Sequence, residues 1–397
     1  MRCSSSPTIS IYMETPLLYR QLQDQLGQWV LPQDQRHLQG VAEAVAAILQ
    51  SQSAVLGKWL PYLTHRGCSA RAHLERLAYL LHNDDITAER FYVPLLQAML
   101  QGFEETTVTL VLDTSMLWDQ FCLIEVCLAW GGRSLTLAQV VLEHGSATVG
   151  FEDYRKVLEA AQAVLPTGCE VTFLADRGFQ HRELLRWLQQ QGWHWTLRVK
   201  SDFQVTLTTG KTRTVAQLLP PMQQAYLFEA VTVWDELTVH LATAHVPIAG
   251  EAWAVLSNQS PSLQTFALYG ERFGGIEPHF KDYKSAAFEV VQSGLREAPV
   301  LTRLFMLLDI AYLIAVILGV MLVQQGRRLT LDWHGQRGLS FLQLGLRECA
   351  RLSYRRLMLP LLKRLPQANP PPACASKRKR ETLDTRIEFS KVVRFSA

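Results

Sequence analysis

The segment from Leu304 to Val323 limits the folds open to this chain more than any other feature. It runs for twenty residues with Asp309 as its only charged residue. About twenty apolar residues are enough for a helix to cross a bilayer, although a charged side chain is costly there. A helix enclosed by a protein core is also apolar on all sides. We expect a core helix and no membrane span, because the sequence has no second segment of this kind.

The composition is that of a globular protein. The chain has 397 residues, of which 48% are hydrophobic and 19% charged. This excludes a disordered chain and allows one large domain or two to three smaller ones. Seven cysteines include no Cys-x-x-Cys pair, and residues 1–21 contain no apolar stretch behind a basic start. We therefore expect a reduced, cytoplasmic protein without a structural zinc site.

Positive charge is concentrated near the C-terminus, although the net charge of the whole chain is only +3. From residue 341 to the end there are 13 Lys or Arg residues against 4 Asp or Glu residues. A polyanion such as nucleic acid would be attracted to this part of the chain. A solvated basic tail would give the same count, so charge alone leaves both interpretations open.

Hydrophobic periodicity divides the chain into five parts. Residues 1–100 are predicted to be a helical region with a possible DNA-binding role, and 101–200 the first part of an α/β core. Residues 201–260 are predicted to be a β-rich insertion, 261–365 the second part of the core with C-terminal helices, and 366–397 a basic, mobile tail. Three strands, a helix, a strand, a helix and a strand in the first core part predict a mixed sheet.

Two aspartates follow short apolar runs that are typical of buried strands. Asp113 comes after Thr109-Leu-Val-Leu, and Asp176 comes after Thr172-Phe-Leu-Ala. Neighbouring strands lie about 5 Å apart, so acids at two adjacent strand ends can share a cation. Mg²⁺ prefers such oxygen ligands. An Asp after a strand is also a common turn residue, so neither position identifies a site by itself.

A third acid is available in residues 269–284, which read Tyr-Gly-Glu-Arg-Phe-Gly-Gly-Ile-Glu-Pro-His-Phe-Lys-Asp-Tyr-Lys. Glu277 precedes a proline that suits the first turn of a helix, where the helix end would orient its carboxylate. Lys284 lies seven residues later and would share a helix face with it. Glu271 and Asp282 are rival acids that the spacing does not exclude.

This segment resembles the YREK signature of bacterial insertion-sequence DDE transposases, Tyr-x2-Arg-x3-Glu-x6-Lys. The chain departs from the signature by one additional residue between Arg272 and Glu277, which the pair Gly274-Gly275 could accommodate before the helix. Asp113-Thr-Ser-Met-Leu resembles the first-Asp motif of that family, and Ala175-Asp-Arg-Gly-Phe resembles the second.

Two further stretches are similar to parts of the same family. Trp253-Ala-Val-Leu-Ser-Asn is similar to the strand that precedes the signature, and Gly338-Leu-Ser-Phe-Leu-Gln-Leu-Gly-Leu-Arg resembles its C-terminal helix. The resemblance covers about residues 100–350. Each motif is weak alone, and their order makes the set specific.

The resemblance implies a ribonuclease H-like core and a DNA transposase that cuts and rejoins DNA at insertion-sequence ends. Asp113, Asp176 and Glu277 would be catalytic and would bind Mg²⁺ or Mn²⁺, with two ions expected. The partners implied are double-stranded DNA, comprising transposon ends and target, and a second copy of the chain in a homodimer on DNA.

The resemblance also implies DNA contacts. Tyr269, Arg272 and Lys284 would contact phosphates near the cleaved end. Trp253 would stack on a base flipped out of the duplex, although a place in a core strand is the commoner role for such a residue.

A basic stripe is predicted near the C-terminus. Arg347, Arg351 and Arg355 are spaced four residues apart and would lie on one face of a helix. We expect either this stripe or the basic run at residues 377–380 to bind DNA.

Three alternatives remain open from the sequence. The first is another ribonuclease H-like DNA nuclease. The second is a catalytically inactive DNA-binding derivative, against which the presence of all three acids argues. The third is a membrane-attached protein, which would use the apolar segment as an anchor.

Overall fold

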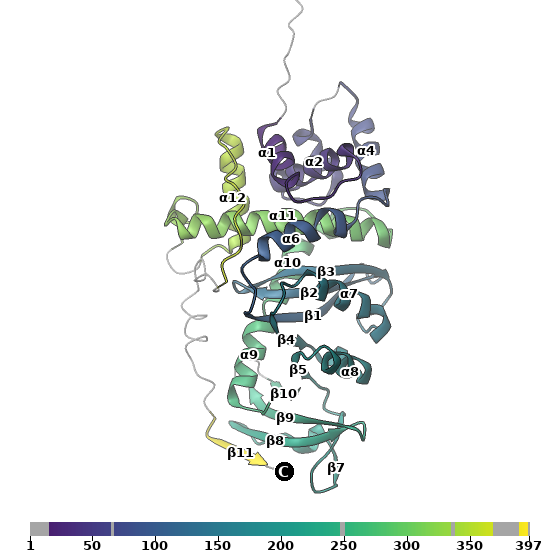
Figure 1. Ribbon diagram of the computed structural model, residues 1–397, viewed down its shortest axis with the longest axis vertical. Coiled ribbons are helices and arrows are strands. Elements are labelled where there is room, and N and C mark those ends of the chain that lie inside the picture. Colours follow the sequence, from purple (N-terminus) through teal and green to yellow (C-terminus); the bar gives the residue numbers. More distant parts are fainter. Residues whose placement is uncertain (1–15, 65–66, 247–250, 335–337, 368–388, 396–397) are drawn as a thin grey trace, which may run out of the picture.

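The structure is a computed structural model that describes residues 16–64, 67–246, 251–334, 338–367 and 389–395. The molecule is elongated, with the N-terminal helices at one end and a β-rich part at the other (Figure 1). A long helix, α11, crosses the molecule between the N-terminal helices and the sheet.

The first five strands form a mixed sheet, as predicted. Strands β1 (Thr107–Leu117), β2 (Phe121–Trp130) and β3 (Arg133–Glu143) pair antiparallel in sequence. Strand β4 (Glu170–Ala175) runs parallel to β1, and β5 (His194–Arg198) runs parallel to β4. The order β3-β2-β1-β4-β5 therefore places β1 between an antiparallel and a parallel neighbour.

Helices cover this sheet. Strand β2 is buried along its whole length, which explains why its sequence is apolar at every position except Glu125 instead of alternating. Helix α7 (Phe151–Val164) packs against β2 and β3, and α11 also packs against β3. Helix α8 (Arg182–Gln190) follows a single 3-10 turn at Arg177–Phe179 and packs against β5.

The β-rich insertion predicted over residues 201–260 continues the same sheet. Strand β10 pairs antiparallel with β5, and the order then runs β10-β9-β8-β6-β7. The strands are β6 (Gln204–Thr206), β7 (Thr212–Thr214), β8 (Gln224–Val233), β9 (Leu237–Val246) and β10 (Glu251–Ser257), with a 3-10 turn at Val215–Leu218.

The N-terminal region is helical. Its helices are α1 (Leu17–Leu26), α2 (Gln35–Ser51), α3 (Leu56–Trp59), α4 (Ala70–His82), α5 (Ala88–Phe91) and α6 (Val93–Leu100), with a 3-10 turn at Leu60–Tyr62. Asp34 caps α2 by accepting a hydrogen bond from the Arg36 backbone at 2.7 Å. Helix α2 packs against α11, and this contact joins the helical end to the core.

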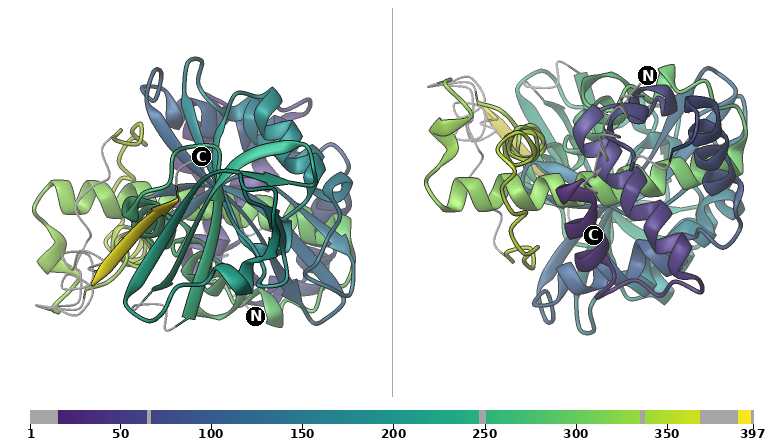
Figure 2. Two further views of the ribbon diagram at one scale, coloured as in Figure 1. Left: turned by 90° about the horizontal axis from the view of Figure 1, so that it is seen from below. Right: turned by 90° about the horizontal axis from the view of Figure 1, so that it is seen from above.

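The apolar segment forms α11 (Ala298–Gln324), and the predicted core helix is confirmed. Among the described residues this is the one helix long and apolar enough to cross a membrane, yet 94% of its most apolar window is buried inside the protein. Helix α12 (Phe341–Tyr354) crosses it, and the view from above shows the two helices meeting to one side of the N-terminal helices (Figure 2).

Shorter elements complete the second part of the core. They are α9 (Leu263–Phe273), α10 (Ile276–Lys281), a π-helical turn at Asp282–Ala286, and 3-10 turns at Val290–Gln292 and Arg328–Thr330. Helix α9 packs against β1, β2, β4 and β10, and α10 packs against β1 and β3.

The C-terminal part differs from the prediction in two places. We expected helices to about Arg364, but α12 ends at Tyr354 and the chain continues without regular structure. The backbone amides of Leu359 and Leu362 donate to side chains of α1 instead. In the predicted mobile tail, the described residues include strand β11 (Lys391–Phe395), which pairs parallel with β8.

Candidate active site

The two aspartates lie side by side on parallel strands. Leu112 of β1 pairs with Ala175 of β4, so Asp113 and Asp176 occupy the next position on each strand. Strand β4 ends at Ala175, as predicted. The predicted end of β1 at Asp113 is wrong, because the following residues keep pairing with β2 up to Leu117. Asp113 therefore lies where its parallel neighbour stops.

Glu277 approaches the same edge from another element. It lies in the first turn of α10, which packs against β1, and its side chain is exposed. Helices α9 and α10 are separated by Gly274 and Gly275. The additional residue of the signature therefore falls in this interruption and not inside a helix.

Electrostatic coupling brings the three acids together. The pKa of Asp113 is raised from 3.8 to about 7, mainly by burial, with a smaller contribution from the nearby charges of Asp176 and Glu277. A hydrogen bond of 2.8 Å from the Thr114 backbone amide to Asp113 Oδ1 opposes this shift. The three carboxylates come from a strand, a strand end and a helix far apart in sequence, and Asp176 and Glu277 are near enough to act on the charge of Asp113.

The acids offer the oxygen ligands that a divalent cation prefers, but among the described residues the group with ligand atoms all within 4.8 Å of one another is Glu125, Cys127 and His279, not these three. Asp176 Oδ1 is buried and has no hydrogen-bond partner among the described residues. Arg198 Nη1 lies 4.0 Å from it, at the outer limit of an ion pair. Three carboxylates with an oxygen atom left unpaired match the ligand chemistry of Mg²⁺ or Mn²⁺.

Lys284 also lies near these acids. It is half-buried in the π-helical turn that follows α10. Burial lowers the pKa of its ammonium group, and the charge of Asp113 acts in the opposite direction. Lys284 therefore lies close enough to Asp113 for the charge of the carboxylate to act on its ammonium group.

Tyr269 is placed differently from the predicted DNA contact. Its side chain is only 2% exposed, and its hydroxyl donates to the carbonyl oxygen of Ala175 at 3.1 Å. Its ring stacks on Phe273 with 5.1 Å between centroids. Because α9 packs against the sheet, Tyr269 supports the end of β4 from within the core. The side chain of Arg272 lies outside the described residues.

Arg198 is a residue of this site that the sequence did not single out. It lies at the end of β5, where its guanidinium is 3.0 Å from Glu251 Oε1 and 5.2 Å from the ring centre of Trp253. Trp253 is half-buried and meets Tyr269 edge-on. Only its position at a strand end could have drawn attention to Arg198, because nothing local marks it.

Residues 120–314 match the transposase DDE domain family.

This match supports a DDE transposase. The matched transposase domain contains Asp176 and Glu277 and begins after Asp113. No curated protein matches the chain. Among solved structures, the chain is similar to a piggyBac transposase in a synaptic complex with hairpin DNA. That similarity covers 97% of this chain and 87% of the other, at 11% identity and a TM-score of 0.42.

The rival acids of residues 269–284 are placed as follows. Asp282 is buried and its carboxylate lies 3.4 Å from Arg133 Nε. Burial raises the pKa of this carboxyl, and the charge of Arg133 counteracts the rise. Asp282 is therefore partnered within the core by a cation of β3. The side chain of Glu271 lies outside the described residues.

The predicted basic stripe follows the matched residues 120–314, and only some of its side chains could contact DNA. Arg351 donates to both carboxylate oxygens of Glu348 at 2.7 Å, so its charge is compensated. Arg347 is exposed and donates to the carbonyl oxygen of Leu331 at 2.9 Å. Arg355 is exposed and lies just after α12. The basic run at residues 377–380 lies outside the described residues.

Two arginines of the predicted helical region at residues 1–100 form ion pairs within the protein. Arg76 pairs with the buried Glu43 at 2.6 Å, and Arg71 pairs with Glu75 at 2.8 Å. Arg76 therefore neutralises a core carboxylate instead of facing outward.

Proposed function

We propose that the protein is a DNA transposase that cuts and joins DNA at insertion-sequence ends, with Asp113, Asp176 and Glu277 as its catalytic carboxylates. One observation carries the proposal. Asp113 and Asp176 follow the paired residues Leu112 and Ala175, and the charges of Asp176 and Glu277 contribute to the raised pKa of Asp113. Two of them fall within the part of the chain that matches the transposase DDE domain.

The proposal includes a ribonuclease H-like core. Three antiparallel strands followed by two parallel ones, with helices packed on the sheet, support it. In such a sheet Asp113 and Asp176 lie on the adjacent strands β1 and β4. A cation shared by two acids requires this placement.

The proposed chemistry needs two divalent ions, Mg²⁺ or Mn²⁺. Asp113, Asp176 and Glu277 would hold such ions, which would supply activation of a nucleophile and stabilisation of the leaving oxygen of a phosphodiester. The chain would contribute the rest. Asp113 must give up its proton before it can act as a ligand, and Asp176 offers its unpaired Oδ1. Lys284 would hold a phosphate oxygen beside Asp113.

The proposed DNA contacts near the site centre on Arg198 and Trp253. A guanidinium held by Glu251 beside a half-buried indole offers a cation for a phosphate and an aromatic face for a base. Tyr269 would act through Ala175 instead of touching DNA. Two protomers would be needed on DNA, because two transposon ends must be joined.

The test of the proposed function is an excision assay. The gene with its flanking DNA would be placed on a plasmid, and excision compared between the parent and Glu277→Gln. We expect excision in the parent and at least a hundredfold loss in the variant, because a third carboxylate ligand is removed. Glu159→Gln is the matched control, since Glu159 lies on α7 and pairs with Arg155 on the surface.

Other outcomes of this assay have defined meanings. Equal excision by the parent and by soluble Glu277→Gln would remove Glu277 from the site and direct attention to Glu271 or Asp282. Cleavage of DNA by the purified parent without joining would favour another nuclease of the same fold. DNA binding without cleavage would favour an inactive derivative.

A further inference from the structure

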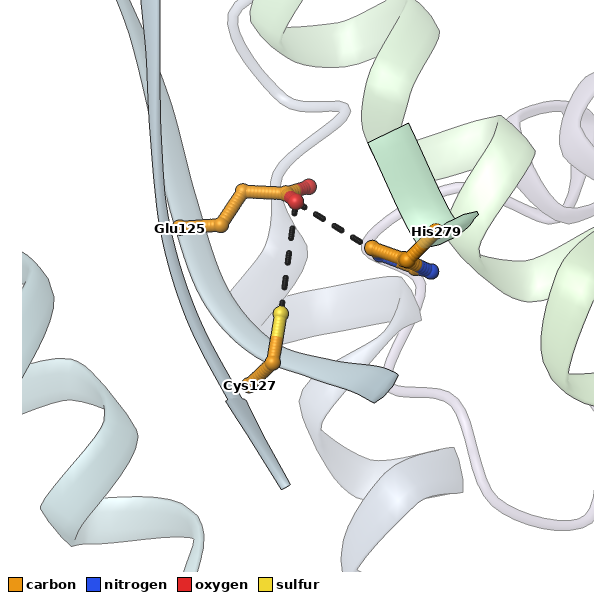
Figure 3. A group of neighbouring side chains, drawn as sticks. All are labelled: Glu125, Cys127 and His279. Carbon is orange, nitrogen blue, oxygen red and sulfur yellow. Dashed lines mark hydrogen bonds and ion pairs between the residues drawn. The ribbon is translucent and has the colours of Figure 1, made fainter. Parts of the chain in front are cut away.

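A buried polar cluster lies next to the proposed active site, on β2 and α10. Glu125, Cys127 and His279 are fully buried, and one ligand-type atom of each lies within 4.8 Å of the others (Figure 3). Glu125 Oε2 is 3.5 Å from His279 Nε2 and 4.0 Å from Cys127 Sγ. None of these residues belongs to the proposed catalytic set, so the cluster needs its own explanation.

The cluster connects the strand beside Asp113 to the helix that carries Glu277. Glu125 of β2 is the pairing partner of Asp113 in β1, and directly opposed residues share one face of a sheet. His279 lies two residues after Glu277 in α10. Two residues correspond to about 200° around a helix, so Glu277 faces outward while His279 faces the core. The contact between Glu125 and His279 therefore ties α10, which carries Glu277, to β2, the strand paired with β1 at Asp113.

The same cluster also holds the turn that carries Lys284. Thr136 of β3 places its hydroxyl 3.2 Å from His279 Nε2 and 3.3 Å from the hydroxyl of Tyr283. Tyr283 in turn donates to Asp309 of the core helix α11. Lys284 is the next residue in the chain, so the hydrogen bonds of Tyr283 also restrain its backbone.

Stability alone gives a poor account of this arrangement. Replacing a buried ion pair by apolar side chains is often neutral or stabilising, because desolvation offsets the attraction. Hydrogen bonds differ from apolar contacts in that they specify direction and distance. Helix α10 has only six residues, and a helix this short has little stability of its own. The hydrogen bond between Thr136 and His279, with Glu125 also facing Nε2, would fix its position more closely than apolar packing alone.

We infer that Glu125, Thr136, His279 and Tyr283 form a positioning cluster that holds Glu277 and Lys284 against Asp113. This inference rests on the proposed function, because it concerns the geometry of the same site. The four residues touch no substrate; they act through α10 and the π-helical turn. Cys127 lies beside the cluster and is not required for the connection.

The test measures Mn²⁺ binding by the metal-free full-length protein without DNA, using the electron paramagnetic resonance signal of free Mn²⁺. The main variant carries Glu125→Leu and His279→Leu together, which removes both polar partners at once. We expect it to unfold cooperatively near the parent temperature and to bind Mn²⁺ about 10–100-fold more weakly, the usual effect of losing a partner that orients a ligand.

Two single variants keep the test decisive if the double variant fails to fold. Thr136→Val has nearly the same shape and removes the bridging hydroxyl, so we expect weaker Mn²⁺ binding and faster amide hydrogen exchange in residues 276–286. Ser134→Ala is the control. Ser134 is buried on the same strand, its hydroxyl has no partner among the described residues, and its loss should change neither quantity.

The outcomes separate this inference from the proposed function. Parent-like Mn²⁺ binding by the folded double variant, or by Thr136→Val if the double variant does not fold, would overturn the positioning role. Tightly bound zinc in the purified parent, lost in the double variant, would also overturn it, because the cluster would then be a metal site. Asp113→Asn tests the function itself: if that variant binds Mn²⁺ like the parent, the proposed metal site is wrong.

Discussion

Asp113 shows how a single residue can be costly to the fold and useful to the site. The chain places its carboxyl beside two other acids and limits its access to water, so its pKa rises from 3.8 to about 7. A carboxylate that is poorly solvated and repelled by its neighbours is a poor anion and a good cation ligand. The loss of folding stability that this placement causes should be measurable as a dependence of stability on pH.

We expect the metal-free protein to lose stability as the pH rises from about 4 to 7 through the contribution of Asp113. The unfolded chain releases this proton near pH 3.8, while the folded protein retains it until about pH 7. The folded state therefore binds more protons over this range, and stability falls with rising pH. Asp113→Asn should gain about 1–4 kcal/mol on the parent between pH 5 and pH 8.

Urea unfolding of both proteins at the two pH values checks this prediction. The difference between parent and variant cancels contributions of other groups that titrate in the same range. Added Mn²⁺ should restore the parent at pH 8 and leave Asp113→Asn unchanged. A difference that stays the same at both pH values would contradict the assigned pKa.

At the scale of elements, the crossing of α11 and α12 depends on two glycines. A Cβ atom added to Gly345 would lie 1.7 Å from the carbonyl oxygen of Ala315, and one added to Gly319 would lie 2.0 Å from that of Phe341. The two helices therefore touch backbone to backbone. This close approach allows the buried helix α11 to be covered by α12 as well as by the sheet and α2.

Gly345→Ala should destabilise the protein by about 3 kcal/mol or more, because the methyl group can be accommodated only if the helices move apart. Gly57→Ala is the control, since Gly57 lies in helix α3 and has no atom within 4 Å of its added Cβ. We expect it to be neutral or slightly stabilising. Chemical denaturation measures both. Equal stability of the two variants would show that the helices do not approach this closely in solution.

At the scale of the whole molecule, positive charge lies on the chain that follows the core. Exposed basic side chains occur on and after α12, at Arg347, Arg355, Arg356, Lys363 and Arg364. The structure thus adds neighbours to the predicted stripe and removes Arg351, whose charge Glu348 compensates.

Arg355→Gln combined with Arg356→Gln should weaken DNA binding equally for all sequences. If each arginine neutralises one phosphate, the slope of log K against log salt should become about 1–2 units less steep. Arg155→Gln is the control, because Glu152 and Glu159 already pair with that guanidinium. Fluorescence anisotropy with end and unrelated duplexes at several salt concentrations gives the slopes. An unchanged slope would exclude these two residues from the DNA interface.

Local patterns determined the elements of the core. The sequence predicts strands at residues 121–130 and 170–175 and helices at residues 151–165 and 182–191. Strands β2 and β4 have these bounds, and α7 and α8 each end one residue earlier. These elements have strong hydrophobic periodicity and clear glycine or proline boundaries, which depend on neighbours in sequence. The apolar composition of α11 was likewise enough to predict a buried helix once a second span was absent.

Only part of the candidate site could be predicted from local sequence patterns. Asp113, Asp176 and Glu277 could be named from their positions after apolar runs and before Pro278, and the structure brings them into electrostatic contact. How each is used stays a prediction. The continuation of β1 past Asp113 could not be read locally, because it depends on pairing with β2.

Only the tertiary structure decided which side chains face the site and which face the core. Tyr269 turns inward to Ala175, Arg198 reaches Asp176 from another strand, and the charge of Arg351 is compensated by Glu348. Local sequence patterns were enough to predict most helices and strands of the core and to name the acids that could share one edge of the sheet. Side-chain direction and partners depend on contacts between segments far apart in the chain, and no local pattern contains that information.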